Sequence, residues 1–110
     1  MVADVRRFDV WLVNLDPTQG SEIRKTRPCV VISPDEMNRH IRTVIIAPMT
    51  STRRRYPTRV DLTFRKTKGQ VALDQIRTID NSRLTRKLGR LPERRARAVA
   101  DVLVEMFAYN

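Results

Sequence analysis

The sequence predicts a mostly β fold, a small curled β-barrel that is closed by one C-terminal helix. Three observations predict it. Apolar runs with strand-like patterns fill the first two thirds of the chain, the last third changes to helical spacing, and breaks containing proline or glycine separate the runs. With 110 residues, of which 41% are hydrophobic and 31% charged, the chain is long enough for one globular domain spanning 1–110 with a modest core.

Five strands are expected, at residues 8–13, 30–32, 43–47, 58–64 and 69–76. The first has apolar side chains on both faces, Trp11 among them, which predicts a strand covered on both sides. Ser33 and Pro34 end the second strand, and Ser33 is expected to cap a short helical turn. Pro48 is expected to end the third, and the fourth alternates cleanly between apolar and polar residues.

A helix is expected over residues 92–108. Pro92 suits a first helical turn, and the carboxylate of Glu93 beside it suits the positive end of the helix dipole. Apolar residues then recur every three or four positions and form one stripe, typical of a helix packed on its own core. The stripe consists of Ala96, Val99, Val102, Leu103, Met106 and Phe107.

The chain carries 22 lysines and arginines against 12 acidic residues, a net charge of +10. Such an excess favours nucleic acid as a partner, because lysine and arginine on a phosphate backbone release counterions. A solvated basic surface without a ligand is the alternative. A membrane partner is not expected, since no apolar run approaches the roughly 20 residues that span a bilayer. The N-terminal residues lack the apolar stretch of a secretory signal, so a cytoplasmic protein is expected.

Neither a cofactor nor a metal is expected. Cys29 is the only cysteine and lies in an apolar run, which predicts a buried, inert thiol and no disulfide. His40 is the only histidine, and it is expected in a solvated loop rather than in a zinc site. The sequence contains no phosphate-binding loop of the nucleotide-hydrolase kind.

Four loops are dense in polar residues: 18–26, 48–57, 65–68 and 74–78. RNA can be cleaved without metal when the ribose 2′-hydroxyl attacks the neighbouring phosphate. The protein then supplies a base, an acid and cationic donors to the phosphate oxygens. Arg27 and Thr50 are candidate donors, and Glu22 and Asp74 are candidates for the base or for the group that orients Arg27.

Each candidate also has a structural interpretation. Arg27 is equally suited to ending a strand or pairing with Glu22, and Glu22 suits a solvated loop. Thr50 and Ser51 are ordinary turn residues. The arginine run at 53–55 is either solvated surface or a phosphate-steering segment. Tyr56 is the candidate for stacking on an unpaired base.

The assembled residues resemble the MazF/PemK family of toxin–antitoxin endoribonucleases. The matching segments are 11–18, 20–22, 26–34, 38–39, 47–51, 74–80 and 88–92. The resemblance covers nearly the whole chain, in order and at the family's spacing. It implies an SH3-like barrel of the PemK/CcdB kind with a C-terminal helix and short helical turns.

The resemblance also implies an activity and partners. Family members are homodimers that cleave single-stranded RNA without metal, leaving a 2′,3′-cyclic phosphate and a 5′-hydroxyl. A MazE-like antitoxin with an acidic tail blocks the RNA groove. DNA is met only through the toxin–antitoxin complex, and no cofactor is used.

Residue by residue, the resemblance places Arg27 on the family's catalytic arginine and Thr50 on its catalytic hydroxyl. Glu22 falls on a loop acid, and Asp74 on an aspartate that is the base in one branch. That branch uses a histidine where this chain has Ser21 and a second arginine where it has Ala72, so the complete mechanism of that branch is not expected here. Loop 18–26 is expected to gate the site. The expected RNA contacts are Gly20, Ser21, Lys25, Ser51, Arg53, Arg54, Tyr56, Lys68, Gln75 and Arg77.

Two rival functions fit the same fold. One is a toxin that binds and poisons a protein target such as gyrase. The other is a non-catalytic nucleic-acid-binding autoregulator. The presence of Arg27 with Thr50 favours the nuclease over the first rival, because a toxin that only inhibits a protein has no need of a phosphate-activating arginine and hydroxyl.

Overall fold

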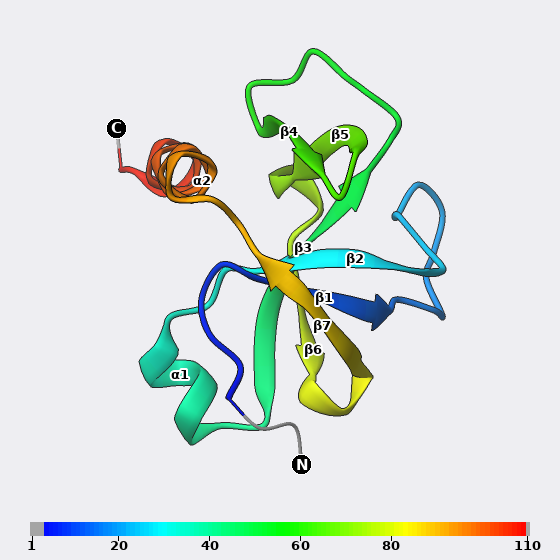
Figure 1. Ribbon diagram of the computed structural model, residues 1–110, viewed down its shortest axis with the longest axis vertical. Coiled ribbons are helices and arrows are strands. Elements are labelled where there is room, and N and C mark those ends of the chain that lie inside the picture. The colour runs from blue at the N-terminus through cyan, green and yellow to red at the C-terminus, as the bar shows by residue number, and fades with distance from the viewer. Residues whose placement is uncertain (1–3, 110) are drawn as a thin grey trace.

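The computed structural model describes residues 4–109, which form a curled antiparallel half-barrel with a C-terminal helix (Figure 1). The strands are β1 (Asp9–Asn14), β2 (Thr26–Val31), β3 (Thr43–Thr50), β4 (Arg59–Phe64), β5 (Thr67–Ala72), β6 (Arg77–Asp80) and β7 (Leu84–Arg90). The helices are α1 (Asp35–His40) and α2 (Glu93–Phe107), and the 3-10 turns are η1 (Leu73–Gln75) and η2 (Asn81–Arg83). The strands pair in the order β4-β5-β3-β2-β1-β7, and β6 pairs with β3. The mostly β fold with a C-terminal helix is therefore confirmed.

The curled sheet buries side chains on both of its faces. Val10 and Val30 join one core cluster, whereas Trp11, Val13 and Cys29 join a second one. Successive residues of a strand point to opposite faces, so two clusters arise from the same two strands. This confirms the prediction that the first strand is covered on both sides and that Trp11 is buried.

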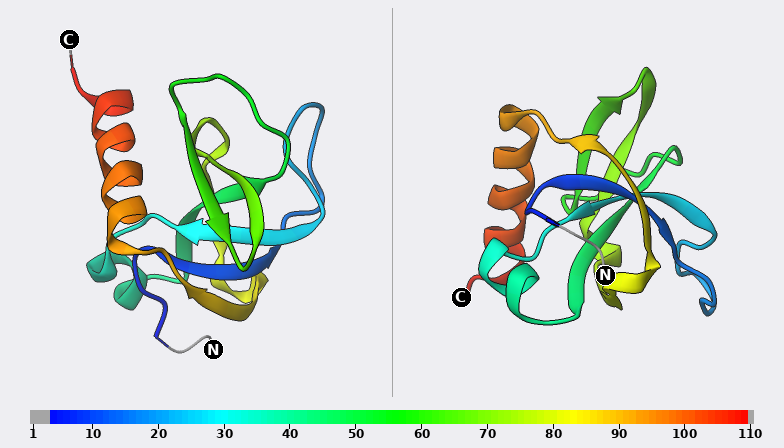
Figure 2. Two further views of the ribbon diagram at one scale, coloured as in Figure 1. Left: turned by 45° about the horizontal axis from the view of Figure 1, so that its top comes forward. Right: turned by 60° about the horizontal axis from the view of Figure 1, so that its bottom comes forward.

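Helix α2 lies along one side of the half-barrel, as both views in Figure 2 show. Ala96 and Val99 are buried in the first core cluster, and Leu103 and Met106 pack against it. Phe107 is 68% exposed, so its predicted place in the apolar stripe is wrong. The helix contacts β4 and η1. Phe107, its last residue, does not pack against that core cluster.

Both prolines of the second and third strands lie inside the sheet. The predicted end of the third strand at Pro48 is wrong, because β3 continues to Thr50. Strand β3 pairs with β6 up to Ile46 and with β5 from Met49. Pro48 lies in the gap between these two ladders, so the N–H that a proline lacks is not required for a hydrogen bond to β5 or β6. Strand β2 likewise begins earlier than predicted and contains Pro28, just before its ladder to β3 starts.

The predicted fifth strand, 69–76, covers only the second part of a strand and the turn that follows it, so its predicted end is wrong. Strand β5 ends at Ala72, the 3-10 turn η1 follows, and β6 begins at Arg77. The chain turns here because β5 and β6 pair with different parts of β3. Strand β7, which the sequence analysis did not predict, pairs with β1 and has an irregular register.

The short helix α1 begins at Asp35, and its N-terminus has no side-chain cap. The predicted capping role of Ser33 is therefore wrong. Its buried hydroxyl donates to Asn38 Oδ1 at 2.5 Å and accepts from the Ile45 N–H at 3.0 Å. Ser33 thus connects α1 to β3 instead of starting the helix.

Within residues 4–109, neither helix has the length and apolar character needed to cross a membrane. The sequence-based expectation about a secretory signal rests partly on residues 1–3, which lie outside the described residues.

Candidate functional site

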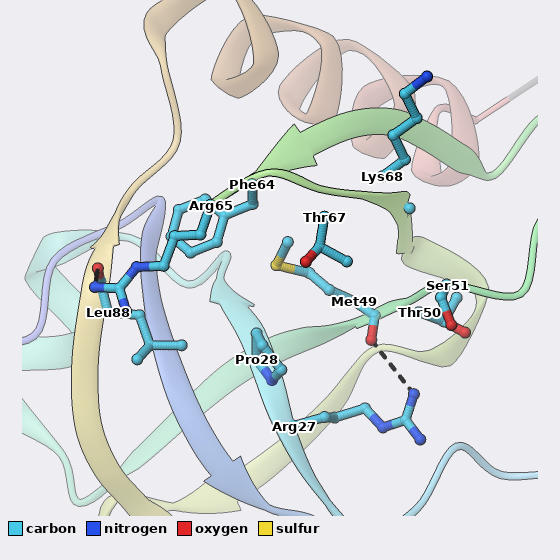
Figure 3. A pocket seen from close by; sticks show the side chains of 11 residues that line it. Arg27, Pro28, Met49, Thr50, Ser51, Phe64, Arg65, Thr67, Lys68 and Leu88 are labelled. Atoms are coloured by element: carbon cyan, nitrogen blue, oxygen red, sulfur yellow. Dashed lines mark hydrogen bonds between the residues drawn. The ribbon is translucent and has the colours of Figure 1, made fainter.

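Arg27 and Thr50 lie on neighbouring strands at the same end of the sheet. Strand β2 runs antiparallel to β3 with Cys29 opposite Pro48, and continuing that register places Arg27 opposite Thr50. Both residues line two adjoining pockets, one mainly apolar and one mainly polar. The guanidinium of Arg27 points toward Met49, Thr50 and Ser51 (Figure 3). The two candidates that sequence analysis placed 23 positions apart are therefore neighbours.

Backbone carbonyls, not carboxylates, hold Arg27 in place. Its Nε donates to the Arg24 carbonyl at 2.9 Å, and a terminal nitrogen donates to the Met49 carbonyl at 3.4 Å. Among residues 4–109, neither Glu22 nor Asp74 pairs with Arg27, so the expected orientation of Arg27 by a carboxylate is not found. A guanidinium carries five N–H donors, which leaves further donors for an anion in the pocket.

The hydroxyl of Thr50 is free to donate. Its Oγ1 accepts from the Thr52 N–H at 3.1 Å, which uses a lone pair and leaves the hydroxyl proton available. The backbone of Thr50 also has a close neighbour on β5. A Cβ added at Gly69 would lie 2.6 Å from the Thr50 carbonyl oxygen. Gly69 is therefore a position at which only hydrogen fits beside the candidate site, a role the sequence analysis did not assign.

The mainly apolar pocket has a volume of about 410 Å³. Pro28, Met49, Phe64 and Leu88 form its apolar wall (Figure 3). The β4–β5 hairpin supplies basic residues on its rim, Lys68 among them, and Arg65 donates to the Leu88 carbonyl. Lys68, an expected RNA contact, therefore lies on the apolar side of the Arg27–Thr50 pair.

The mainly polar pocket, of about 700 Å³, gathers most of the other candidates. It lies between the β1–β2 loop (residues 15–25), the β3–β4 loop (residues 51–58) and η1. The candidates that line it together with Arg27 and Thr50 are Ser21, Glu22, Ser51, Arg54, Tyr56, Asp74 and Gln75. Three chain segments that are distant in sequence thus meet around the arginine and the threonine.

Backbone hydrogen bonds to side chains hold the β1–β2 loop. The Lys25 N–H donates to Asp16 Oδ1, and the Ile23 N–H donates to Gln75 Oε1, both at 3.1 Å. Glu22 Oε1 accepts from the Gln19 N–H at 2.5 Å. Gln75 thus ties the loop to η1 and keeps Glu22 at the pocket. Gly20 lies between these contacts with a φ of +54°.

Asp74 lies in the polar pocket but is paired with an arginine that the sequence analysis did not single out. Its two carboxylate oxygens accept from Arg59 Nε at 2.7 Å and from a terminal nitrogen at 3.2 Å, and the Thr58 hydroxyl donates to it at 3.0 Å. Burial raises the pKa of Asp74, but the hydrogen bonds from Arg59 and Thr58 outweigh it, so the net pKa is below its usual value. A carboxylate held in this way is a weaker base.

The arginine run of the β3–β4 loop is exposed, but its backbone is anchored. The side-chain amide of buried Gln70 accepts from the Arg54 N–H and donates to the Arg54 carbonyl, each at 3.0 Å. Arg53 lies 3.6 Å from Asp61 in an adjoining pocket that Arg27 does not line. The loop is thus not merely solvated, and Gln70 is a second residue that sequence reasoning missed.

Besides Lys68 and Arg53, three further expected RNA contacts do not line the polar pocket. Arg77 donates to the Leu15 carbonyl at 3.0 Å and lines a smaller neighbouring pocket together with Glu22. Lys25 and Gly20 lie on the exposed β1–β2 loop. None of the three lines either of the two pockets that contain Arg27 and Thr50.

Cys29 and His40, the one cysteine and the one histidine of the sequence, do not line the two pockets around Arg27 and Thr50. Cys29 is fully buried, and burial raises the pKa of its thiol to about 12 despite the nearby charges of Arg27 and Arg77. This confirms a buried thiol. His40 is exposed as predicted, but it ends α1 rather than lying in a loop. Within residues 4–109, no three His, Cys, Asp or Glu side chains are grouped so that they could hold a metal ion.

The family model described as PemK-like, MazF-like toxin of type II toxin–antitoxin system matches residues 6–107. The chain belongs to this family.

Solved structures agree with the family match. MazF from Deinococcus radiodurans is 26% identical, with a TM-score of 0.83 over 96% of this chain and 97% of that chain. An endoribonuclease from a mycobacterial species, in complex with its cognate antitoxin, is 23% identical, with a TM-score of 0.81 over 97% and 100%. The Mycobacterium tuberculosis toxin MazF-mt6 is 24% identical, with a TM-score of 0.77 over 93% and 98%. These likenesses establish the MazF-like fold.

Proposed function

We propose that the protein is the toxin of a type II toxin–antitoxin system and acts as a metal-independent, sequence-specific endoribonuclease on single-stranded RNA such as mRNA. One observation carries the proposal: Arg27 and Thr50 meet at the end of β2 and β3, where loops of high positive charge surround them. Such a pair suits a phosphate whose negative charge grows during reaction. Cleavage of mRNA would inhibit translation and growth.

The proposed step is an internal transesterification. The ribose 2′-oxygen forms a bond to phosphorus, the bond from phosphorus to the 5′-oxygen breaks, and the products carry a 2′,3′-cyclic phosphate and a 5′-hydroxyl. One proton leaves the 2′-hydroxyl and one reaches the departing 5′-oxygen. Arg27 and Thr50 donate hydrogen bonds to the non-bridging oxygens, where they stabilise the charge that develops.

Glu22 is the proposed acceptor of the 2′-hydroxyl proton. It lines the same pocket as Arg27 and Thr50, and it has no arginine partner among the described residues, unlike Asp74. The remaining candidates bind the RNA around the scissile phosphate. They are Gly20, Ser21, Lys25, Ser51, Arg53, Arg54, Tyr56, Lys68, Gln75 and Arg77.

The proposed partners follow the family. A homodimer would present the RNA groove, and an acidic MazE-like antitoxin would cover it in the cytoplasm. The complex of a mycobacterial endoribonuclease with its cognate antitoxin and the MazE–MazF structures of D. radiodurans support the antitoxin. The net charge of +10 is complementary both to RNA and to an acidic tail.

The test is cleavage of a long single-stranded RNA in EDTA, with mapping of the new 5′ ends. The protein is expected to cut at a short recurring motif, and Arg27→Ala is expected to abolish cutting without loss of dimerisation. Arg97→Ala is the matched control, because Arg97 is a surface arginine of α2 whose one ion-pair partner within residues 4–109 is Glu93. If the folded protein leaves the RNA intact while still arresting growth, it poisons another target and the nuclease proposal is wrong.

A further inference from the structure

The polar pocket contains a partly buried ion pair that the proposed chemistry does not use. Arg59 and Asp74 meet at two points, at 2.7 and 3.2 Å, and the side chain of Arg59 is only 7% exposed. A two-point contact between a guanidinium and a carboxylate fixes the plane of both groups. Arg59 comes from the start of β4 and Asp74 from η1, so the pair also joins these two elements.

Tyr56 rests on this pair. The centre of the Arg59 guanidinium lies 5.2 Å from the centroid of the Tyr56 ring, within the range of a cation–π contact. The Arg59 N–H also donates to the Tyr56 carbonyl at 3.1 Å, which closes the turn between them. Tyr56 is nevertheless 50% exposed, and it lines the pocket that contains Arg27 and Thr50. The ring is supported by the arginine and still presents half of its surface.

The chain leading to Tyr56 is held as well. Buried Gln70 makes two hydrogen bonds to the backbone of Arg54, and its amide also donates to Asp61 at 2.8 Å. The Thr58 hydroxyl donates to Asp74 at 3.0 Å. A loop fixed on either side of Tyr56 loses little conformational freedom when a ligand binds, so the ring is preorganised.

We propose that Arg59 and Asp74 are a positioning pair that holds Tyr56 as a stacking platform for one unpaired RNA base beside the Arg27–Thr50 site. Asp74 then acts through Arg59 and Tyr56, not as the base of the reaction. Aromatic side chains stack on unpaired bases of any identity, because every base has a π-face. The inference rests on RNA being the substrate, and it deepens that proposal by giving the pocket a base subsite.

Steady-state cleavage tests the pair. Tyr56→Leu is expected to raise KM by roughly 5-fold to 150-fold, the loss of one base stack, with a smaller effect on kcat. Tyr56→Phe keeps the ring and should restore near-native KM. Asp74→Asn should raise KM as well, and the double variant with Tyr56→Leu should be no worse than Tyr56→Leu alone. Tyr109→Leu, which removes a fully exposed tyrosine at the C-terminus, is the matched control.

The pH dependence of kcat separates positioning from base catalysis. If Asp74 positions Tyr56, Asp74→Asn keeps the profile of the native protein. If Asp74→Asn mainly lowers kcat and removes the acidic limb, Asp74 is the base and the proposal is wrong. The double variant gives a second criterion. If its increase in KM equals the product of the increases caused by Asp74→Asn and Tyr56→Leu alone, the two residues act independently and the proposal is wrong.

A binding signal that needs no cleavage distinguishes this inference from the nuclease proposal. Tyr56→Trp adds an indole to a chain whose only other tryptophan, Trp11, is buried. Its fluorescence should be quenched by mixed-sequence single-stranded RNA with 2′-O-methyl riboses, and adding Asp74→Asn should weaken that quenching. Quenching without cleavage of ordinary RNA would keep the platform and reject the nuclease. Cleavage of ordinary RNA without quenching would keep the nuclease and reject the platform.

Discussion

Gly69→Ala is expected to impair RNA cleavage by displacing the backbone of Thr50. A Cβ at this position would lie 2.6 Å from the Thr50 carbonyl oxygen, and the nearest atoms are backbone atoms that cannot swing aside. To reach an ordinary contact of 3.4 Å, the two strands must separate locally by roughly 0.8 Å. The neighbouring Met49 carbonyl, which holds Arg27, lies on the same strand end. Because a misplacement of about 1 Å can reduce a rate about 100-fold, we expect kcat/KM to fall by about 10-fold to 100-fold.

The assay measures two quantities for each variant: its kcat/KM on one single-stranded RNA and its thermal unfolding midpoint. Cleavage is measured at a temperature well below that midpoint, so that each variant is folded. Val60→Ala is the control for stability, because Val60 is a buried residue of β4 whose truncation removes core contacts without lining either pocket. It should lower the free energy of unfolding by about 1 to 3 kcal/mol and leave cleavage by the folded protein unchanged. Native kcat/KM in Gly69→Ala would refute the reasoning that strand geometry at Thr50 sets the rate.

Three further predictions concern charge and protonation. Replacing Arg53, Arg54 and Arg55 by alanine should weaken binding of 2′-O-methyl RNA and reduce the slope of log affinity against log salt by up to about 2, and an unchanged slope would mean that the run does not touch phosphate. Cys29 should resist a thiol reagent at pH 8 until the protein unfolds, because a pKa of about 12 leaves very little thiolate; rapid labelling of the native protein would contradict its burial. The pKa of Asp74 is lower in the folded protein than in the unfolded chain, so its contribution to stability is present above the unfolded pKa and is lost as the pH falls through the folded pKa. Asp74→Asn should therefore lower the free energy of unfolding at pH 7, and this effect should shrink as the pH falls below the unfolded pKa of an aspartate, as urea titrations at a series of pH values would measure.

Local patterns were sufficient for the elements with strong periodicity. Apolar residues on both faces of 8–13 predicted β1, and the three- and four-residue spacing after Pro92 predicted α2. Both signals depend only on neighbours in the sequence. Pro48 misled, because a proline is tolerated inside a sheet where the adjacent ladder is absent, and only the pairing of β3 with β6 and β5 reveals that gap.

In the candidate site, too, some features could be predicted from the sequence and others depend on the tertiary structure. The resemblance singled out Arg27 and Thr50, but their meeting depends on the β2–β3 register, which no local pattern specifies. Arg59 gave no signal, since an arginine between Thr58 and Val60 reads as the polar face of a strand. Its burial and its pairing with Asp74 depend on η1, where the predicted strand was wrong. The sequence therefore indicated Asp74 as a candidate base without revealing that Arg59 pairs with it.

The most direct test of the proposed reaction removes one hydroxyl from the substrate. A single-stranded RNA carrying the mapped cleavage motif is compared, in EDTA, with the same oligonucleotide that has a 2′-deoxy sugar at the nucleotide before the cut, and mass spectrometry identifies the product ends. Attack by the 2′-oxygen predicts that only the all-ribose strand is cut, with a 2′,3′-cyclic phosphate on one product and a 5′-hydroxyl on the other. Equal cutting of the deoxy-substituted strand would contradict it, because the attacking 2′-oxygen would then be unnecessary.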